Sequence, residues 1–290
     1  MKKFTTIYIN GSSLSCGGSL EVNTEAFKYY IQNYDIPKWD NSKDVSYGNV
    51  LANMIGAKAI NESKQGGGLD RLIRKSYNYI NSKTNKELKE TLFVFDIPIQ
   101  PSRFEVYSKQ FKDWFTVSIA YRNSEESPSP LTISMQDGDI ESILSLSRDY
   151  GTPSLNLNFS DMKKHCELLS QYASEYHDYM QEANRLLREL TFFYCYLDKL
   201  EINYIRDISD VFFAGSINFG NTSNDDFFDR LKMFEGSNQN AIDSPTIWRI
   251  SSENKWTIKD EIGIEDSHLG YYGNRKYAEY LHNLLISNNL

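Results

Sequence analysis

The sequence predicts a doubly wound α/β domain, in which a mostly parallel sheet carries helices on both faces and a hairpin is inserted. First, residues 4–10 (FTTIYIN) form an apolar, β-branched run that stops in a turn of small residues, as a buried strand does. Second, further short apolar runs alternate with segments of helical period. Third, residues 273–286 (GNRKYAEYLHNLLI) form an amphipathic helix that closes the chain. No internal repeat or low-complexity linker divides residues 1–290, so we expect one domain.

The first hundred residues alternate between expected strands and helices. Gly56 is placed to end a short amphipathic helix, and a continuous apolar run in front of Pro98 is typical of a buried parallel strand. The expected elements are a strand at 4–10, a loop running into a short helix at 19–33, a polar turn-rich stretch at 37–47, a helix at 49–55, a strand at 57–61, a loop and helix at 62–81, and a strand at the end of 87–97.

After residue 100, only some segments have a clear prediction. Residues 104–119 (FEVYSKQFKDWFTVSI) alternate charged with aromatic residues, which favours an exposed hairpin within an insertion at about 102–133. Residues 160–200 have a long helical period, which favours one or two core-facing helices over coiled-coil pairing. A further strand is expected at 202–208 (INYIRDI). Residues 134–146 stay ambiguous, and most of 211–260 shows no clear period.

Composition excludes several classes of function. The formal charge is −8 with acidic and basic residues interspersed, so no basic face is available for nucleic acid. The apolar run near the N-terminus is too short for the core of a signal peptide, and no stretch approaches the roughly 18 apolar residues of a membrane span. We therefore expect a cytoplasmic protein, located in the host-cell cytoplasm if the gene is viral.

The cysteines predict neither a disulfide framework nor a zinc site. Cys16, Cys166 and Cys195 are an odd number without paired spacing, and thiols in a reducing compartment are the simplest interpretation. Cys16 is the exception to follow, because it lies close to Ser13. We expect no metal and no cofactor. The aromatic content of 14% is compatible with a thick core or with a surface that contacts sugars.

Two turns carry candidate chemistry. Ser13 follows the first strand, at the carboxyl edge where open α/β sheets place their sites, and it is either a nucleophile or an ordinary turn residue. Gly66, Gly67 and Gly68 lie between a strand and a helix, where free amides suit an oxyanion and flexibility suits a plain turn. The glycine turn lacks the Lys-Ser/Thr ending and the GxGxxG spacing of phosphate-binding loops.

Elimination among the four histidines selects His268 as the candidate base. The other three, His165, His177 and His282, lie within expected helices. His268 lies in a short loop just before the last helix, and two carboxylates that could orient its imidazole, Glu265 and Asp266, come directly before it. This is the logic of a nucleophile–base–acid triad.

These residues resemble the SGNH/GDSL hydrolase family, in a divergent form of the variant group found in phage and bacterial genomes. Gly11-Ser12-Ser13-Leu14 matches the first block, Gly-Asp-Ser-Leu, with Ser13 at the nucleophile and Ser12 replacing the aspartate. Residues 61–71 match the second block, with Gly66 as an oxyanion amide. Residues 266–270, followed by Gly273-Asn274, match the fifth block with its catalytic Asp and His. The resemblance implies a three-layer α/β/α, flavodoxin-like sandwich.

The chain departs from the family pattern in two places. Residues 93–105 (FVFDIPIQPSRFE) stand where the third block should have Gly-x-Asn-Asp, so the asparagine of the oxyanion hole is missing and Gln100 is the nearest substitute. The family's acid more often lies three residues before the histidine, which would select Glu265. We prefer Asp266, because a shorter carboxylate two positions back on an extended loop reaches the same side as the imidazole.

The resemblance implies a serine esterase that works through an acyl-enzyme. Ser13, His268 and Asp266 would form the triad, and the amides of Ser13 and Gly66 the oxyanion hole. The implied substrate is a small-molecule or glycan ester, such as an O-acetylated carbohydrate, with the hairpin shaping the cleft. Further contacts or supports are expected from Glu265, Asn61, Gln100 and Arg103. The alternatives are a non-catalytic binding or structural protein of the same fold, and an acyltransferase that uses the same triad.

Overall fold

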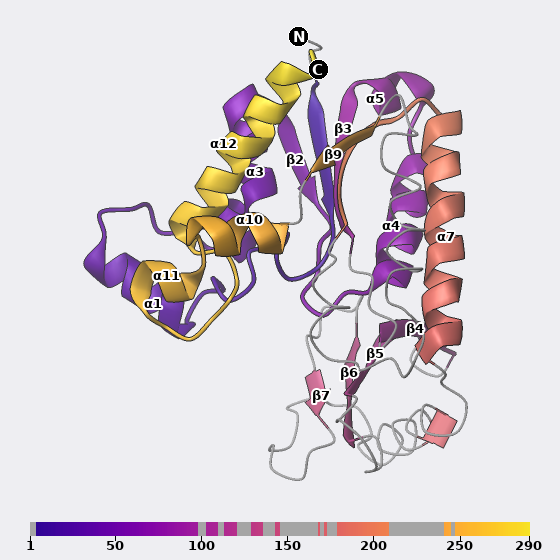
Figure 1. Ribbon diagram of the computed structural model, residues 1–290, viewed down its shortest axis with the longest axis horizontal. Coiled ribbons are helices and arrows are strands. Elements are labelled where there is room, and N and C mark those ends of the chain that lie inside the picture. Colours follow the sequence, from indigo (N-terminus) through magenta and orange to yellow (C-terminus); the bar gives the residue numbers. More distant parts are fainter. Residues whose placement is uncertain are drawn as a thin grey trace.

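The computed structural model describes residues 4–97, 103–109, 113–120, 129–135, 143–145, 168, 171–172, 179–208, 241–244 and 247–290. Within these residues the central sheet has five parallel strands in the order β2-β1-β3-β8-β9. Their bounds are β1 Thr6–Asn10, β2 Lys58–Asn61, β3 Thr91–Ile97, β8 Asn203–Ile208 and β9 Ala241–Ser244. Figure 1 shows this sheet between two layers of helices.

The two faces of the sheet are covered by different helices. One face packs on α4 (Leu69–Asn81) and α7 (Tyr179–Lys199) through Tyr8 and other aromatic residues. The opposite face packs on α3 (Tyr47–Ile55), α10 (Ile247–Asn254) and α12 (Tyr271–Ser287). Ile7 and Ile9 face this second layer, because successive side chains of a strand point to opposite faces. The arrangement confirms the predicted three-layer α/β/α fold with a mostly parallel sheet.

The strand order places a topological switch point at β1. The chain goes from β1 to β2 on one side and then to β3 on the other side of β1. In open parallel sheets a crevice forms at the carboxyl ends of the strands where the order reverses in this way. The turn after β1 and the loop after β2 therefore meet at this edge.

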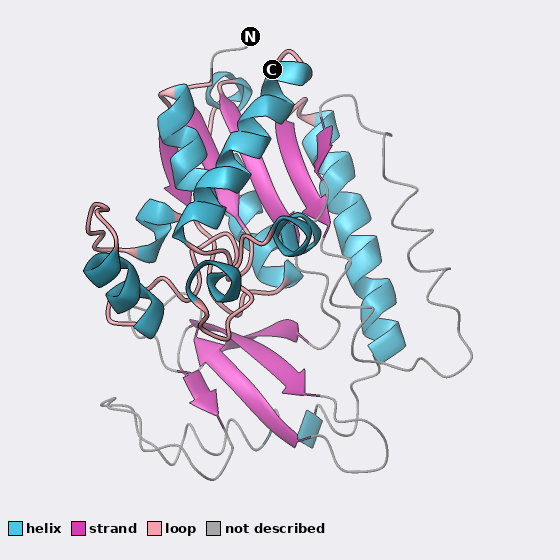
Figure 2. Cartoon of the chain, turned by 60° about the vertical axis from the view of Figure 1, so that its left-hand side comes forward, coloured by secondary structure: helices cyan, strands magenta, loops and turns pink. Residues whose placement is uncertain are grey.

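The predicted hairpin is part of a second sheet. It is antiparallel in the order β4-β5-β6-β7, formed by Arg103–Ser108, Asp113–Ala120, Ser129–Met135 and Ile143–Ser145. The predicted hairpin is β4 with β5, in which Arg103 pairs with Ser118. The sheet continues through β7, beyond the expected limit at residue 133. Figure 2 shows it as a separate layer of strands below the central sheet.

Several short helices were not expected from periodicity. A helix lies within the stretch predicted to be only turn-rich, and the described residues of the unassigned segment 211–260 contain β9, α10 and the start of α11 (Ile258–Ile262). Three of the short helices begin with reciprocal capping boxes, which satisfy free amides without needing a long apolar stripe. These unexpected short helices are α2 (Ser42–Val45), α5 (Asn85–Lys89) and α11, whereas α1 (Glu25–Asn33) is the short helix expected within residues 19–33.

Some predictions lie outside the described residues. These concern Gln100, Cys166, His165 and His177, and the first part of the helical stretch 160–200, of which α7 is the described continuous helix. No helix in the described part of the chain is both long and apolar enough to cross a membrane. Within the same residues, no group of three or more His, Cys, Asp or Glu side chains is arranged to hold a metal ion.

Candidate active site

Ser13 lies in a tight turn that directly follows β1. The turn closes with a hydrogen bond from the amide of Gly18 to the carbonyl of Ser13, at 2.7 Å. Gly11 allows the chain to press against β3, because a Cβ atom there would lie 2.7 Å from Cβ of Asp96. The side chains of Ser12 and Ser15 are buried, whereas Ser13 is only half-buried. The turn therefore presents one of its three serines to a substrate.

Asp96 holds this turn from the neighbouring strand. Its Oδ2 atom accepts hydrogen bonds from the amide of Ser12 at 3.0 Å, from the hydroxyl of Ser12 at 2.6 Å and from the hydroxyl of Ser15 at 3.0 Å. Asp96 is buried, and burial raises the pKa of its carboxyl although the hydrogen bonds from Ser12 and Ser15 act in the opposite direction. Ser12 stands where the family has an aspartate, and here β3 supplies the carboxylate to the turn.

The loop that carries His268 is fixed against the start of α11. The carbonyl of His268 accepts the amide of Ile258 at 2.8 Å, and the carbonyl of Asp266 accepts the amide of Lys259 at 3.0 Å. A β-bridge between Thr257 and Leu269 adds to this support. The backbone on both sides of the imidazole is therefore held by defined partners.

The loop brings His268 to Ser13 and to Asp266. The Nε2 atom of His268 lies 2.9 Å from the hydroxyl oxygen of Ser13. Its Nδ1 atom lies 2.7 Å from Oδ1 of Asp266, which also accepts the backbone amide of His268 at 2.8 Å. The side chains of His268 and Asp266 keep 22% and 23% of their surface exposed, so a substrate can reach them. These contacts have the geometry that a nucleophile, a general base and an orienting acid require.

The two candidate acids point in different directions. Glu265 forms an ion pair with Lys259 at 2.9 Å, and its side chain is 81% exposed. Burial opposes ionisation of Asp266, but hydrogen bonds from Ser19 and from the amide and imidazole of His268 outweigh it and hold the pKa of Asp266 below its ordinary value. Asp266 is therefore ionised at neutral pH, and Glu265 is not a partner of His268.

The amides of Ser13 and Gly66 are the two that the family resemblance assigns to an oxyanion hole. Within the described part of the chain, neither amide donates a hydrogen bond to a protein acceptor. The Gly67 amide is engaged, since it donates to the carbonyl of Lys64 at 3.0 Å. The Lys64 amide in turn donates to the carbonyl of Gly11 at 3.3 Å, which ties the glycine loop to the turn that carries Ser13. Gly66 adopts a φ of 74°, a conformation that favours glycine.

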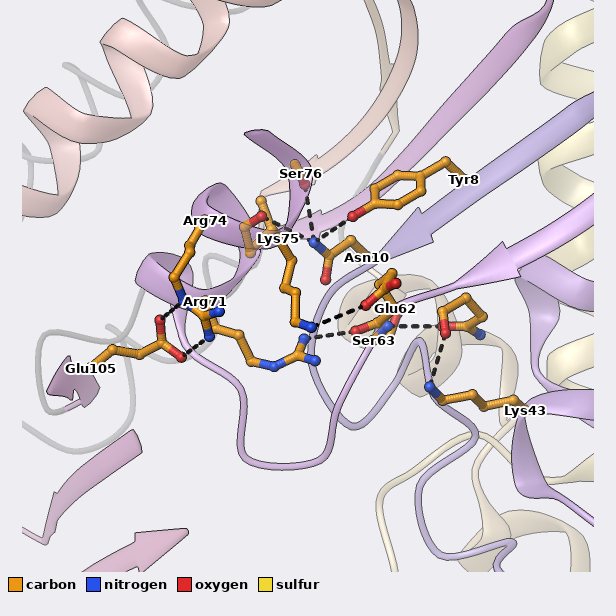
Figure 3. A network of polar contacts seen from close by, with 12 residues as sticks. Tyr8, Asn10, Lys43, Glu62, Ser63, Arg71, Arg74, Lys75, Ser76 and Glu105 are labelled. Atoms are coloured by element: carbon orange, nitrogen blue, oxygen red, sulfur yellow. Dashed lines mark hydrogen bonds and ion pairs between the residues drawn. The ribbon is translucent and has the colours of Figure 1, made fainter. Parts of the chain in front are cut away.

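Polar contacts hold the glycine loop at both ends, as Figure 3 shows. On the α4 side, Arg71 donates to the carbonyl of Glu62 at 2.7 Å, and Lys75 forms an ion pair with the Glu62 side chain at 3.6 Å. On the β2 side, Lys43 donates to the carbonyl of Asn61 at 2.9 Å. The side chain of Asn61 donates to the carbonyl of Ser15 at 3.0 Å, so Asn61 supports the turn.

Arg103 lies at the start of β4, next to the end of the glycine loop. A Cβ atom on Gly68 would lie 3.4 Å from Cβ of Arg103. Burial lowers the pKa of the Arg103 guanidinium. The second sheet therefore begins beside the loop that contains Gly66, whereas Gln100 lies outside the described residues.

Two solved structures of carbohydrate esterases are similar to this chain at the level of overall shape. One is an acetyl xylan esterase (Est2A) from the rumen bacterium Butyrivibrio proteoclasticus, with 10% sequence identity and a TM-score of 0.44. The other is a carbohydrate esterase described as having divergent catalytic and non-catalytic binding functions in its active site, with 10% identity and a TM-score of 0.41. The alignments cover 98% and 99% of this chain, which spans 64% and 69% of the two esterases. Likeness at this level does not define an activity.

Sequence comparison adds no closer relative. No protein family matches the chain. No curated protein matches it.

Sequence reasoning missed three residues that shape the site. Asp96 had a usable signal, because it is an acidic residue inside the apolar run of β3. Gly18 lies against both catalytic candidates, since a Cβ atom there would be 3.0 Å from Cβ of Ser13 and 3.0 Å from Cδ2 of His268. The hydroxyl of Ser19 lies 3.2 Å from Nδ1 of His268. No sequence pattern distinguishes Gly18 or Ser19 from ordinary turn residues.

Proposed function

We propose that this protein is a serine hydrolase that cleaves esters, with Ser13 as nucleophile, His268 as general base and Asp266 as the acid that orients His268. The supporting observation is the continuous pair of contacts from Ser13 to His268 at 2.9 Å and from His268 to Asp266 at 2.7 Å. Hydrogen-bonded neighbours of these types activate a hydroxyl that is a weak nucleophile on its own. A purely structural serine turn has no need of a half-exposed imidazole and an ionised carboxylate.

In the first half of the proposed reaction, the Ser13 oxygen attacks the carbonyl carbon of the ester while Nε2 of His268 takes the hydroxyl proton. The carbonyl oxygen becomes an oxyanion. When the intermediate collapses, the bond from carbon to the alcohol oxygen breaks, and His268 donates its proton to the leaving alcohol. The acyl group stays on Ser13. Asp266 keeps a proton on Nδ1 and stabilises the imidazolium that forms in each step.

In the second half, water attacks the acyl-enzyme. His268 takes a proton from the water as its oxygen bonds to the acyl carbon, and then returns the proton to the Ser13 oxygen as the acid leaves. An alcohol acceptor in place of water would give acyl transfer with the same residues. The acyltransferase is therefore a variant of the same proposal, and an acceptor experiment separates the two.

The amides of Ser13 and Gly66 are the donors that we assign to the oxyanion. Losing one such donor costs about 3–4 kcal/mol of transition-state stabilisation in comparable sites. The family's third-block asparagine has no counterpart at β3, where Asp96 instead binds the nucleophile turn. We expect a slower enzyme than a family member with three donors, acting on small acyl esters such as acetyl groups on carbohydrates.

The test combines p-nitrophenyl acetate turnover with labelling by a fluorophosphonate probe. Wild-type protein should turn over the ester and carry the label on the peptide that contains Ser13. Ser13→Ala should lose both, with a fall in kcat of at least about 10³-fold. Ser82→Ala, which changes an exposed serine at the end of α4, is the matched control and should behave as wild type. Equal turnover and labelling by wild type and Ser13→Ala would favour the non-catalytic alternative.

A further inference from the structure

A groove of about 680 Å³ lies outside the triad, where α4, α7 and the strands β4 and β5 meet. In Figure 1 this junction is at the lower ends of the two helices, beside β4. The groove is lined by aromatic rings from α4, β4 and β5, by the ring of Tyr172, which precedes α7 in the chain, and by charged side chains from both helices and β4. Its size is that of a site for a small molecule or for a few units of a polymer. Neither Ser13, His268 nor Asp266 lines it.

The charged side chains of the groove are largely paired with one another. Arg74 makes two parallel hydrogen bonds of 2.8 Å to Glu105, shown in Figure 3. Arg185 binds Asp70 at 2.8 Å and also pairs with Glu182. Glu189 adds a fourth carboxylate to those of Asp70, Glu105 and Glu182. The lining therefore has four carboxylates and two guanidinium groups. The excess of negative charge disfavours an anionic ligand.

The same pairing disfavours a cationic ligand. Three of the four carboxylates, those of Asp70, Glu105 and Glu182, already bind guanidinium groups of this chain. An incoming lysine or arginine would have to displace these partners and leave an arginine unpaired, which is costly for partly buried groups. The ion pairs hold N–H donors and carboxylate oxygens in fixed positions at the wall. Hydroxyl groups match such a set, because each hydroxyl both donates and accepts.

Aromatic rings provide the second half of the recognition surface. Trp114 has the Arg74 guanidinium 4.6 Å from its ring centre, which fixes the indole beside the polar pair. Tyr172 is 51% exposed and lies edge-on to Phe104, with 6.1 Å between ring centres. A sugar ring has this combination of features, because it presents apolar C–H faces to aromatic rings and hydroxyls at its edge to polar groups.

The groove is connected to the proposed oxyanion loop through the first turn of α4. Asp70 is the second residue of α4, separated from the three glycines by Leu69 alone, and its Oδ2 atom accepts the amide of Glu105 at 3.2 Å. The same end of the glycine loop lies against Arg103 at the start of β4. One rigid junction therefore positions both Gly66 and the groove wall.

We infer that this groove binds a neutral oligosaccharide, the part of a glycan ester that lies away from the acyl group attacked by Ser13. The inference rests on the proposed function for the ester end, but the binding of the sugar is independent of catalysis. Oligosaccharide binding would be the role of the second sheet, since β4 and β5 supply Phe104, Glu105 and Trp114 to the groove.

The first experiment measures binding without turnover. Ser13→Ala protein is titrated by calorimetry with cellohexaose, xylohexaose, chitohexaose and mannohexaose, and with anionic hexagalacturonate. At least one neutral hexasaccharide should bind, and hexagalacturonate should bind at least about tenfold more weakly. Tyr172→Ala and Trp114→Ala should each raise Kd by about tenfold or more. Phe192→Ala is the matched control, because this ring is 61% exposed on α7 and does not line the groove.

The second experiment separates the groove from the triad. In protein that keeps Ser13, Tyr172→Ala should lower kcat/KM for an acetylated form of the hexasaccharide that binds by a larger factor than kcat/KM for p-nitrophenyl acetate, whereas Phe192→Ala should leave both at the wild-type value. If Ser13→Ala leaves ester turnover intact, the proposed function fails while the binding result stands. If no neutral hexasaccharide binds, or if Tyr172→Ala and Trp114→Ala bind as Phe192→Ala does, the groove assignment is wrong. Trp114→Phe and melting curves show whether a loss of binding reflects misfolding.

Discussion

Asp96 binds Ser12 twice, through the backbone amide at 3.0 Å and the hydroxyl at 2.6 Å, and so holds the turn that presents Ser13. Asp96→Ala should release this turn and leave Ser12 and Ser15 without their buried acceptor. Misplacing a reacting group by about 1 Å can cost about 100-fold in rate, and we expect a fall in kcat/KM of that order. Asp198→Ala, which removes a carboxylate beside Tyr204, serves as the control and should keep activity. Full activity in folded Asp96→Ala protein would show that the turn keeps its conformation without Asp96.

Asp96 also predicts a pH dependence of stability. Burial raises its pKa in the folded protein above the ordinary value of 3.8, although the hydrogen bonds from Ser12 and Ser15 oppose the rise. As pH increases from that value, the unfolded chain loses the proton first, so this group's contribution to the free energy of unfolding falls until the folded protein ionises as well. Asp96→Asn lacks this term. Urea unfolding at a series of pH values should show that the free energy of unfolding of wild type falls relative to that of Asp96→Asn as the pH rises above 3.8. A difference that stays constant with pH would contradict the raised pKa.

The position of Gly18 predicts a steric effect on Ser13 and His268. Gly18→Ala would place a methyl group 2.8 Å from the Ser13 carbonyl oxygen and 3.0 Å from both Ser13 Cβ and His268 Cδ2, so the Ser13 backbone and the two side chains must shift. We expect kcat/KM for p-nitrophenyl acetate to fall by at least about tenfold. Gly48→Ala is the matched control, because its methyl group would lie 2.5 Å from Ile9 in the core. It should cost about 1–3 kcal/mol of stability and leave the activity of the folded protein unchanged.

The two acidic residues before His268 predict opposite outcomes. Asp266→Ala removes the partner of Nδ1 and should lower kcat by about 10²–10⁴-fold. Glu265→Ala removes only an exposed ion pair with Lys259 and should leave kcat within about twofold of wild type. Parallel kinetics of the two variants decide between them. A larger loss for Glu265→Ala would mean that the loop rearranges when substrate binds.

Asp266 also makes a prediction for acid conditions. Its pKa is lowered in the folded protein, because hydrogen bonds from Ser19 and His268 outweigh the effect of burial. A lowered pKa stabilises the fold above the unfolded value and loses that contribution as pH falls through the folded value. Wild type should therefore lose stability on acidification more steeply than Asp266→Asn. Urea unfolding below pH 5 measures the difference, and identical slopes would contradict it.

Ser19 is predicted to position the Asp266–His268 pair. Its hydroxyl lies 3.2 Å from Nδ1 of His268, and its backbone φ is 65°, which is unfavourable for a residue other than glycine. Ser19→Ala and Ser19→Gly both remove the hydroxyl and should lower kcat by about tenfold. Ser19→Gly should be about 1 kcal/mol more stable than Ser19→Ala, because it relieves the backbone strain. Kinetics and melting curves of the two variants separate the hydroxyl from the backbone.

Cys16 is predicted to be inert, although it lies in the nucleophile turn. The thiol is buried, and burial raises its pKa to about 12. Its sulfur lies 3.3 Å from the carbonyl of Ser13. Iodoacetamide at pH 8 should modify exposed Cys195 in the native protein and reach Cys16 only after unfolding in urea. Rapid native labelling of Cys16 would make it a second candidate nucleophile.

The fold class was predictable because strands and helices leave local periods in a sequence. The helix that ends at Gly56 and the final helix both show it, and the structure has a left-handed Gly56 at that point with φ of 69°. α11 has only five residues, so no period can form, and its start depends on the side chain of Thr257 receiving the amide of Asp260. Such short helices cannot be predicted from periodicity, because contacts with neighbouring elements in the folded protein stabilise them.

The residues of the candidate site also divide into those that the sequence indicated and those that only the structure revealed. Ser13 and His268 were identified as candidates because each residue type stands in a turn at the end of a recognisable element. The choice between Asp266 and Glu265 was left to a geometric argument about the loop. Asp96 was missed because the hydrogen bonds that give it a role come from a turn 84 and 81 positions away in the chain.

The sequence by itself determined the α/β architecture, the turn that carries Ser13 and the loop that carries His268, because these depend on apolar period, turn residues and chain order. Only the tertiary structure decided the strand order around β1, the direction of Asp266 and Glu265, and the support of Ser12 by Asp96. It also decided that β4, β5, α4 and α7 enclose a common groove. The physical reason is that a hydrogen bond or a cavity depends on distances of a few ångströms between residues that can be 255 positions apart, as Ser13 and His268 are.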